Sequence, residues 1–164
     1  MALPNKILPG FSAALFAQPT ATPTALTTAA LSTVATVSAL AITANQLNVE
    51  AIPAFGQDDA VASYSIAGAR QSDQIPTQAA PTSLTITAAW NPSDSQLLIM
   101  RGDAYSGVVD RTFIISATEG ANVIYYAFNG RVGEFKIDAQ PGAEAKCIFT
   151  VHPRGGQYGW SNNA

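Results

Sequence analysis

Apolar and polar residues alternate with a two-residue period over several stretches in the second half of the chain, as in strands with one buried face. Within 83–90, Leu84, Ile86, Ala88 and Trp90 share one parity, while threonine and alanine occupy the other. We therefore predict a strand over 83–90, with its apolar side facing a core.

Strands and turns are predicted to alternate from 112 onward. The strand 112–118 places Phe113 and Ile115 on one face and Ile114 on the other. The Asn129-Gly130 pair is the strongest hairpin signal, because type I′ turns need positive φ at both central positions. The predicted order is strand 112–118, turn 119–122, strand 123–128, hairpin 129–130, strand 131–138, turn at Pro141-Gly142 and strand 143–152.

A short helix is predicted between the strands 83–90 and 112–118. Asn91 is a favourable N-cap and Pro92 suits the first helical position, while Gly102 is expected to end the helix. The inward stripe is predicted to consist of Leu97, Leu98 and the stem of Arg101.

Upstream, the segment 34–42 reads VATVSALAI, and its β-branched residues favour a strand. Asn45 begins a predicted turn, and a second strand follows from 47 to 52, ending at Pro53.

Residues 54–82 are too many for an ordinary hairpin turn. They contain one possible strand, AVASYSIAG at 60–68, between Asp-Asp and Gly-Ala-Arg. Both a two-stranded ribbon projecting from the body and a flexible loop fit this pattern.

The two ends differ from the middle in composition. Prolines interrupt residues 1–33, which we interpret as an extended arm with short strand pieces or as a tail disordered in the free subunit. The end, 153–164, is glycine-rich and is predicted to be an irregular tail. Residues 34–152 are left as the β-rich domain, with 54–82 as its long loop or ribbon.

Charge is sparse, since only 12% of the residues are charged, against roughly 25% in ordinary soluble domains. The neutral surface this leaves favours burial against further copies of the chain; a Thr/Ser/Ala-rich surface that stays soluble is the alternative. The net charge of −3 includes no basic stripe, so tight nucleic-acid binding is not expected. A weakly acidic wall past which DNA slides is compatible with it.

Groups able to do chemistry are few. Cys147 is the only cysteine and His152 the only histidine; five positions apart on a strand, they are separated by about 16 Å and point to opposite faces. Cys147 is therefore expected to be a buried apolar residue. With no catalytic, phosphate-binding or metal-binding motif, we predict no enzyme activity, no cofactor and no metal site.

Three further motifs have simple structural explanations. Asp58-Asp59 would diverge to opposite faces of a strand and favours a solvated loop. Arg101-Gly102-Asp103 matches a tripeptide recognised by integrins, but a helix C-cap already accounts for the glycine. Tyr125 and Tyr126 face opposite sides of a strand, so one is predicted to lie in the core and the other at the surface or in an interface.

No stretch is long and apolar enough for a membrane span. The segment from Lys6 to Ala17 has some features of a signal peptide, with Leu15 and Ala17 near a cleavage-like position. Pro9 and Gly10 interrupt its apolar run, so an exported protein is kept only as an alternative.

The order of elements from SLTITAAWNP and SDSQLLIMRG to FIISATEGANVIYYAFNGRVGEFKIDAQPGAEAKCIFTV resembles the major tail tube proteins of long-tailed phages, especially those with non-contractile tails. The resemblance covers roughly 34–152 and rests on this order, without a diagnostic motif. It implies a mainly β fold with two packed antiparallel sheets, as a sandwich or barrel, flanked by one short helix.

The resemblance also implies a function in the virion. Copies would form hexameric rings whose inner sheets join into one barrel, and the rings would stack into a tube that conducts DNA during ejection. Implied partners are the chain itself and the tape-measure, tail-tip and tail-terminator proteins, with assembly in the host cytoplasm and a final location in the tail.

Contact and channel residues follow from the same resemblance. The loop 54–82 and the arms are the expected contacts between subunits, with candidates Phe55, Gln57, Asp58, Asp59, Tyr64, Arg70, Tyr158 and Trp160. Candidates for the channel wall are Glu134, Asp138 and Glu144. Alternatives are a head decoration protein, a tail terminator, and an exported adhesin-like or pilin-like β-sandwich.

Overall fold

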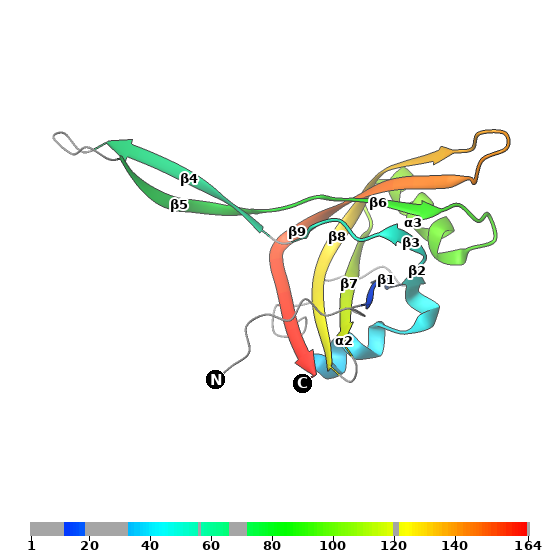
Figure 1. Cartoon of the computed structure of the whole chain (residues 1–164), viewed down its shortest axis with the longest axis horizontal. Coiled ribbons are helices and arrows are strands. Elements are labelled where there is room, and N and C mark those ends of the chain that lie inside the picture. The colour runs from blue at the N-terminus through cyan, green and yellow to red at the C-terminus, as the bar shows by residue number, and fades with distance from the viewer. Residues whose placement is uncertain (1–11, 19–32, 56, 66–71, 120–121, 164) are drawn as a thin grey trace.

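The chain is mainly β, with two α-helices in the part that the structure describes (Figure 1). This computed structural model describes residues 12–18, 33–55, 57–65, 72–119 and 122–163. Side chains are described over these ranges except at 12, 57–65, 72–81, 119 and 155–163. The strands are β1 Ser12–Ala17, β2 Gln46–Leu47, β3 Val49–Ala51, β4 Gln57–Ser65, β5 Ser72–Pro81, β6 Leu84–Ala89, β7 Asp110–Glu119, β8 Asn122–Asp138 and β9 Lys146–Asn163. The helices are α2 Val34–Leu40 and α3 Ser95–Ser106, with a 3₁₀ turn at Thr43–Asn45.

Seven strands form one antiparallel sheet in the order β2-β1-β7-β8-β9-β6-β3. The first and last strands in this order are joined in the chain by a single residue, Asn48, so the sheet curls until it is nearly a barrel. The mainly β class predicted from the sequence is confirmed, and its two packed layers are two halves of this one sheet.

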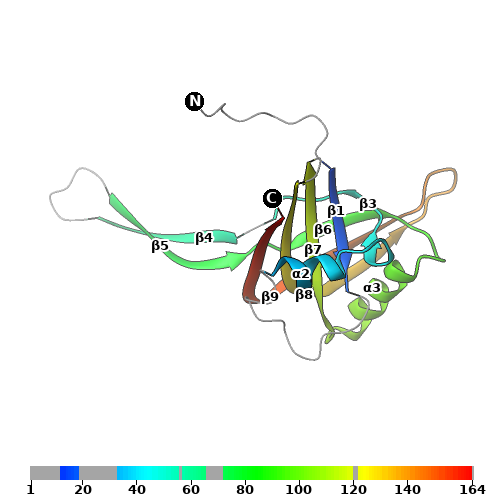
Figure 2. The ribbon, with the colours of Figure 1, turned by 90° about the horizontal axis from the view of Figure 1, so that it is seen from below.

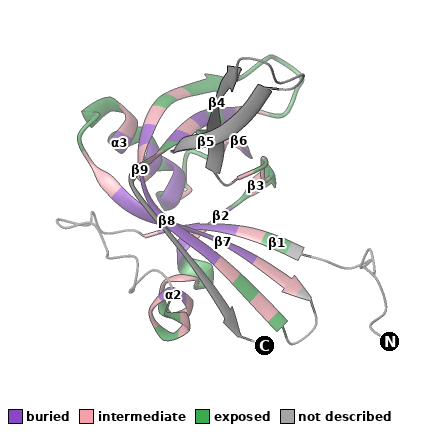
Figure 3. Cartoon of the chain, turned by 90° about the vertical axis from the view of Figure 1, so that its left-hand side faces the viewer, coloured by how far each residue is buried: buried purple, intermediate pink, exposed green. Residues whose placement is uncertain are grey.

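The long strands β8 and β9 run through both halves and change partners on the way. We call β1, β2 and β7 with 122–129 of β8 and 158–163 of β9 the covered half. We call β3 and β6 with 131–138 of β8 and 146–152 of β9 the bare half. Figure 3 shows the two halves facing each other across the core, with α2 beneath the covered half and α3 at one flank.

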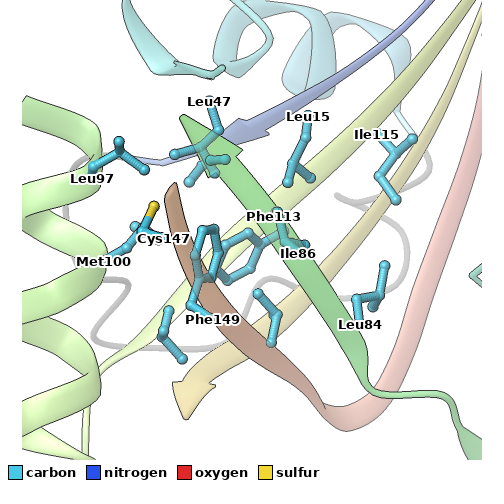
Figure 4. Close-up of a cluster of buried hydrophobic side chains, with 14 of the residues drawn as sticks. Leu15, Leu47, Leu84, Ile86, Leu97, Met100, Phe113, Ile115, Cys147 and Phe149 are labelled. Carbon is cyan, nitrogen blue, oxygen red and sulfur yellow. The ribbon is translucent and has the colours of Figure 1, made fainter. Parts of the chain in front are cut away.

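The core lies between the halves and is lined by aromatic and aliphatic side chains from nearly every strand (Figure 4). Phe113 and Phe128 stack with ring centroids 5.7 Å apart, and Phe135 stacks on Phe149 at 6.0 Å. The alternation predicted for 83–90 is confirmed, because Leu84, Ile86 and Ala88 are all buried in this core. The opposite facing of Ile114 to Phe113 and Ile115 is confirmed too.

The hairpin predicted at Asn129-Gly130 is wrong, since β8 passes through both residues without a turn. Asn129 is buried, and its side-chain oxygen accepts a hydrogen bond from the Thr112 hydroxyl at 2.9 Å. At Gly130, a Cβ atom would come within 2.8 Å of Val151 Cγ1. The glycine is needed here for close packing between strands, a requirement that local turn statistics do not detect.

The strand predicted over 34–42 is also wrong, because 34–40 is helix α2. Val37, Leu40 and Ala41 have helical spacing, and they pack over Phe16 and Ile114 on the outer surface of the covered half. Tertiary packing thus overrides the β preference of the two valines and Thr36. The strand predicted from 47 to 52 is present as β2 and β3, which belong to opposite edges of the sheet.

Helix α3 exists as predicted, but both of its ends differ from the prediction. Its N-cap is Asp94, whose carboxylate accepts from the backbone N–H groups of Gln96 and Leu97, and Asn91 lies before the helix. The helix runs through Gly102 and ends at Gly107, which has a φ of 65°. A glycine one turn further on, with the positive φ of a C-cap, was the better stop signal.

The inward stripe of α3 is Leu97 and Met100, with Ala104 partly buried beside them. Leu98 and Arg101, both predicted to face inward, are exposed.

The end regions contribute strands to the sheet. β1 lies inside the predicted arm 1–33, and its Leu15 and Ala17 are core residues. The boundary drawn at 153 falls inside β9, which continues to Asn163 by pairing with 123–128 of β8. Glycine-rich sequence is therefore compatible with a strand here because a long partner strand is already in place.

Residues 54–82 contain a two-stranded antiparallel ribbon, β4 with β5, which forms a separate sheet. Figures 1 and 2 show the ribbon projecting along the long axis, away from the end that carries α3. The turn predicted at Pro141-Gly142 is confirmed, with a φ of 82° at Gly142, and it joins β8 to β9.

Candidate assembly surfaces

The outward face of the bare half is mostly polar and at least partly exposed. Thr85 and Thr87 of β6 lie opposite Thr150 and Ile148 of β9 on this face, and the Thr85 and Thr150 hydroxyls are 3.5 Å apart. Among the described residues, neither helix packs its apolar stripe against this face, since α2 packs on the covered half and α3 on the core. The face is therefore open to solvent or to whatever fills the space beside it.

Charges on and beside this face are arranged in pairs. Lys136 Nζ donates to Glu134 Oε2 at 2.9 Å, and Lys146 Nζ lies 2.6 Å from Glu50 Oε1. The hydrogen bond from Lys136 lowers the pKa of Glu134, and the one to Glu50 raises the pKa of Lys146. Both lysines are matched with an anion, while Asp138 and Glu144 add exposed acids, so the charges on and beside this face are acidic on balance.

His152 lies at the end of the bare half nearest the ribbon. Its Nδ1 is 3.0 Å from the Ser83 hydroxyl, and its ring covers Gly133, where a Cβ would come within 2.6 Å of Nε2. The glycine gives the imidazole room to lie flat on the strand. Both side chains of this pair are exposed, and the hydrogen bond between them fixes the orientation of the imidazole.

The outward face of the covered half is buried instead. Phe16, Ile114 and Ala127 form a second apolar cluster there, closed by Val37 of α2. Tyr125 packs partly against this cluster, whereas Tyr126 belongs to the main core, so the two tyrosines face opposite sides as predicted. This half cannot present a polar wall unless α2 leaves it.

Each edge strand of the bare half has one side with no strand partner among the described strands, and α3 lies beside β8. Beyond Arg131, β8 pairs with β9 alone among the described strands, and β3 pairs with β6 alone. Neighbouring strands in this half are all antiparallel, so β8 of one copy and β3 of the next would again be antiparallel. Exposed edges of this kind are templates for pairing with another chain.

The predicted contact residues fall in three places. Phe55 packs inside its own subunit, with its ring 4.8 Å from that of Tyr126. Four candidates belong to strand β4 of the ribbon and two belong to β9, and for all six the structure describes the backbone but not the side chain. Arg70 lies outside the described residues. The four are Gln57, Asp58, Asp59 and Tyr64, and the two are Tyr158 and Trp160.

The predicted channel residues all come from the β8–β9 hairpin. Glu134 and Asp138 lie on β8 and are exposed, and Glu144 is exposed in the connection to β9. Sequence reasoning missed the lysines beside them, Lys136 and Lys146. Their alternation with the acids along the two strands was the available signal.

Helix α3 has a second apolar face in addition to its buried stripe. Tyr105 is 80% exposed, Val108 just beyond the helix is 72% exposed, and Leu98 is 42% exposed. Arg101 lies on the same side, one turn from Leu98 and one from Tyr105. We call Leu98, Arg101, Tyr105 and Val108 the α3 outer face.

Asp103 of the Arg101-Gly102-Asp103 tripeptide is buried and holds a two-bond ion pair with Arg111 of β7. Arg111 also donates to the backbone oxygen of Gln18 at 3.2 Å. The aspartate thus fixes α3 to the covered half. Its burial makes it inaccessible to an integrin, although the C-cap explanation for Gly102 was wrong.

The described residues include no group of three or more His, Cys, Asp or Glu side chains placed to hold a metal ion. None of the described helices is long and apolar enough to cross a membrane. Cys147 is buried as predicted, and burial raises the pKa of its thiol.

Comparison with known proteins finds similarity in fold only. No protein-family model matches the chain, and no curated protein is similar in sequence. A chain in the cryo-EM structure of the sheath/tube terminator of PVC, an extracellular contractile injection system in its extended state, aligns with a TM-score of 0.63 at 10% identity. The alignment covers 99% of this chain and 100% of that one.

Two chains of anti-feeding prophage particles are also similar. One, from the 6-fold symmetrised baseplate, has a TM-score of 0.58 at 10% identity, covering 94% of this chain and 95% of that chain. The other, from the tube-terminating cap, has a TM-score of 0.58 at 14% identity, covering 92% and 89%. None of the three is described as part of a non-contractile tail, so the comparisons do not support that part of the prediction.

Proposed function

We propose that this chain is a structural, non-enzymatic subunit of a phage-like tail particle, and that copies of it close into a ring around a central channel. The observation that carries the proposal is the one-sided bare half, with a solvated polar face between two unpaired edges. Joining β8 of each copy to β3 of the next removes both edges and continues the antiparallel pattern. The fold neighbours from injection particles support the same class of assembly.

In such a ring the bare faces line the channel and α2 lies on the outer wall. The paired charges of Glu134 with Lys136 and of Glu50 with Lys146 offset each other, and the exposed Asp138 and Glu144 leave the channel surface weakly acidic. A polymer such as DNA can pass this wall without strong attraction or repulsion. We propose hexameric rings stacked into a tube as the assembled form, with the other tail components as partners.

A tail-terminator or cap subunit is the second candidate, because two of the three fold neighbours come from such structures. The two candidates differ in how far assembly goes. A tube subunit forms filaments of stacked rings, whereas a terminator forms single rings that bind the end of a tube.

Negative-stain electron microscopy with light-scattering mass tests the proposal. We expect hollow rings or tubes of uniform width from the wild-type protein. Ile137→Lys places a charge at the free edge of β8, where the native side chain is 44% exposed, and should give folded monomers.

Ile42→Lys is the matched control, because Ile42 is 48% exposed and lies next to α2, away from the edge. It should assemble like the wild type. Rings from Ile137→Lys at wild-type yield would contradict pairing through this edge.

A further inference from the structure

The ribbon β4–β5 and the α3 outer face are both left incomplete by a single copy of the chain. A two-stranded ribbon on its own is at best marginally stable in water. Among the described elements the ribbon contacts the body mainly where β5 meets β9, at its base. Figure 1 shows most of its described backbone projecting clear of the body.

Helix α3 carries apolar residues on two sides, and its own subunit covers only one of them. Leu97 and Met100 are buried in the core, while Leu98, Tyr105 and Val108 are exposed on the outer face. A helix that is apolar on both sides normally packs against a partner on both sides.

The ribbon and this face are complementary in charge. By sequence, the strands of the ribbon contain Asp58, Asp59 and Asp73 and no basic residue. Of the two charged residues in α3, Asp103 is buried in its ion pair and Arg101 is exposed on the outer face. Arg70 is the one basic residue between the two strands in the sequence, so the segment is acidic on balance, and an acidic ribbon and a face with one exposed cation favour contact.

The two surfaces cannot meet within one molecule. The ribbon projects from one end of the long axis, and α3 lies toward the other end in both Figure 1 and Figure 2. Contact between two different surfaces at opposite ends is heterologous, and repetition of such a contact builds a stack.

We infer that the ribbon of one copy docks on the α3 outer face, Leu98, Arg101, Tyr105 and Val108, of a copy in the adjacent ring. The inference rests on the proposed function and deepens it by identifying the receiving surface for ring stacking. Ring closure uses the β8 and β3 edges; because α3 lies beside β8, ring formation is measured separately from stacking for every variant.

A charge exchange tests the docking. Arg101→Glu should still form rings but should raise the protein concentration needed for stacking by about tenfold or more. Reversal of the ribbon charges, Asp58→Lys with Asp59→Lys and Asp73→Lys, should do the same. Combining the two sets should restore tubes; failure to restore them would overturn the ribbon as the occupant.

Tyr105→Glu tests the apolar part, with Ile42→Glu as a control at an exposed apolar residue outside this face; Ile42 is 48% exposed and Tyr105 80%. The control should stack normally and Tyr105→Glu should stop at single rings. A photo-reactive amino acid at position 105 should cross-link to peptides from 57–81 of another copy. Cross-links confined to other segments would refute the docking site.

The outcomes separate the two claims. Tubes of normal length from both Arg101→Glu and Tyr105→Glu overturn the docking site and leave ring formation intact. Loss of rings as well as stacks places the face within the ring and overturns docking between rings. A wild-type protein that forms no rings overturns both claims.

Discussion

The covered and bare halves of the sheet share one core and differ in what lies outside it. On the covered half, Phe16, Ile114 and Ala127 are sealed beneath α2. On the bare half, the equivalent face carries threonines and matched charges exposed to solvent. A sheet buried on both faces provides rigidity, whereas a sheet buried on one face provides a surface for function.

Strand β8 shows the difference between the two halves in its burial pattern. In β8, residues 126–130 are buried without interruption, as expected of a strand covered on both faces. From 133 to 136, partly buried residues alternate with exposed ones, and 137 and 138 are both exposed. The change of pattern occurs at Gly130, where the strand passes from one half to the other.

The largest test of this comparison places the same charge on each outer face. Ile114 is 1% exposed and Ile148 is 37% exposed. Ile114→Lys should destabilise the fold by about 5 kcal/mol or more, because the ammonium is buried beneath α2 without a partner. Ile148→Lys should change stability by less than about 0.5 kcal/mol.

Urea unfolding followed by circular dichroism measures both variants. Equal effects of the two lysines would mean that the halves do not differ as described.

The second test removes the ion pair that fixes α3 to the covered half. Asp103→Leu leaves the buried guanidinium of Arg111 without a carboxylate to balance its charge and should cost about 3–5 kcal/mol. Joining it with Arg111→Met should recover most of that loss, because two apolar side chains need no pairing. A double variant no more stable than Asp103→Leu in thermal unfolding would refute this explanation.

The third test concerns the point where β8 crosses between the halves. Gly130→Ala should destabilise by about 1–3 kcal/mol, since the added Cβ would lie 2.8 Å from Val151 Cγ1. Gly102→Ala is a control with the opposite expected sign. The added Cβ would meet no atom within 4 Å and position 102 lies in a helix, so the substitution should stabilise the fold by about 0.5–1 kcal/mol. Calorimetry that gives both changes the same sign would contradict the packing role of Gly130.

The smallest effect is expected from the paired charges of the bare half. The lysine hydrogen bond holds the pKa of Glu134 below its ordinary value of 4.5. A lowered pKa favours the carboxylate in the folded state, so its contribution is present above pH 4.5 and is lost as pH falls through the folded-state value.

Lys136→Gln should return the pKa of Glu134 toward its ordinary value, which NMR titration of the side chain can follow. Because both groups are exposed, no measurable change in unfolding is expected. An unchanged pKa in the variant would show that Lys136 is not its cause.

Strands with one buried face, the existence of helix α3 and the Pro141-Gly142 turn could be predicted from the sequence, whereas strand crossing and helix α2 could not. Leu84, Ile86 and Ala88 alternate as β6 requires, and Phe113 and Ile115 separate from Ile114 in β7. The hairpin predicted at Asn129-Gly130 was wrong because Gly130 packs closely against Val151 of β9, a contact that local turn preference does not predict. The strand predicted over 34–42 was wrong because the helix that forms there is stabilised by packing on the sheet beneath it.

The candidate surfaces depended even more on the fold. The acids at 134, 138 and 144 were identified from strand position, but their lysine partners became evident only with the pairing of β8 and β9. Leu98 and Arg101 of the α3 outer face were predicted to face inward. With both helix ends misplaced, the sequence pattern did not distinguish the buried Leu97 from the exposed Leu98. Register and helix phase are the quantities that local sequence does not determine.

The most direct test of the central claim is to locate the two outer faces in an assembled ring. Cys147 is buried, and burial raises the pKa of its thiol, so it should give little background labelling. Thr85→Cys on the bare half and Ala39→Cys on α2 each provide one exposed thiol for a gold cluster. End-on images should show the gold inside the ring for Thr85→Cys and outside it for Ala39→Cys; gold from Thr85→Cys on the outer rim would contradict a channel lined by the bare half.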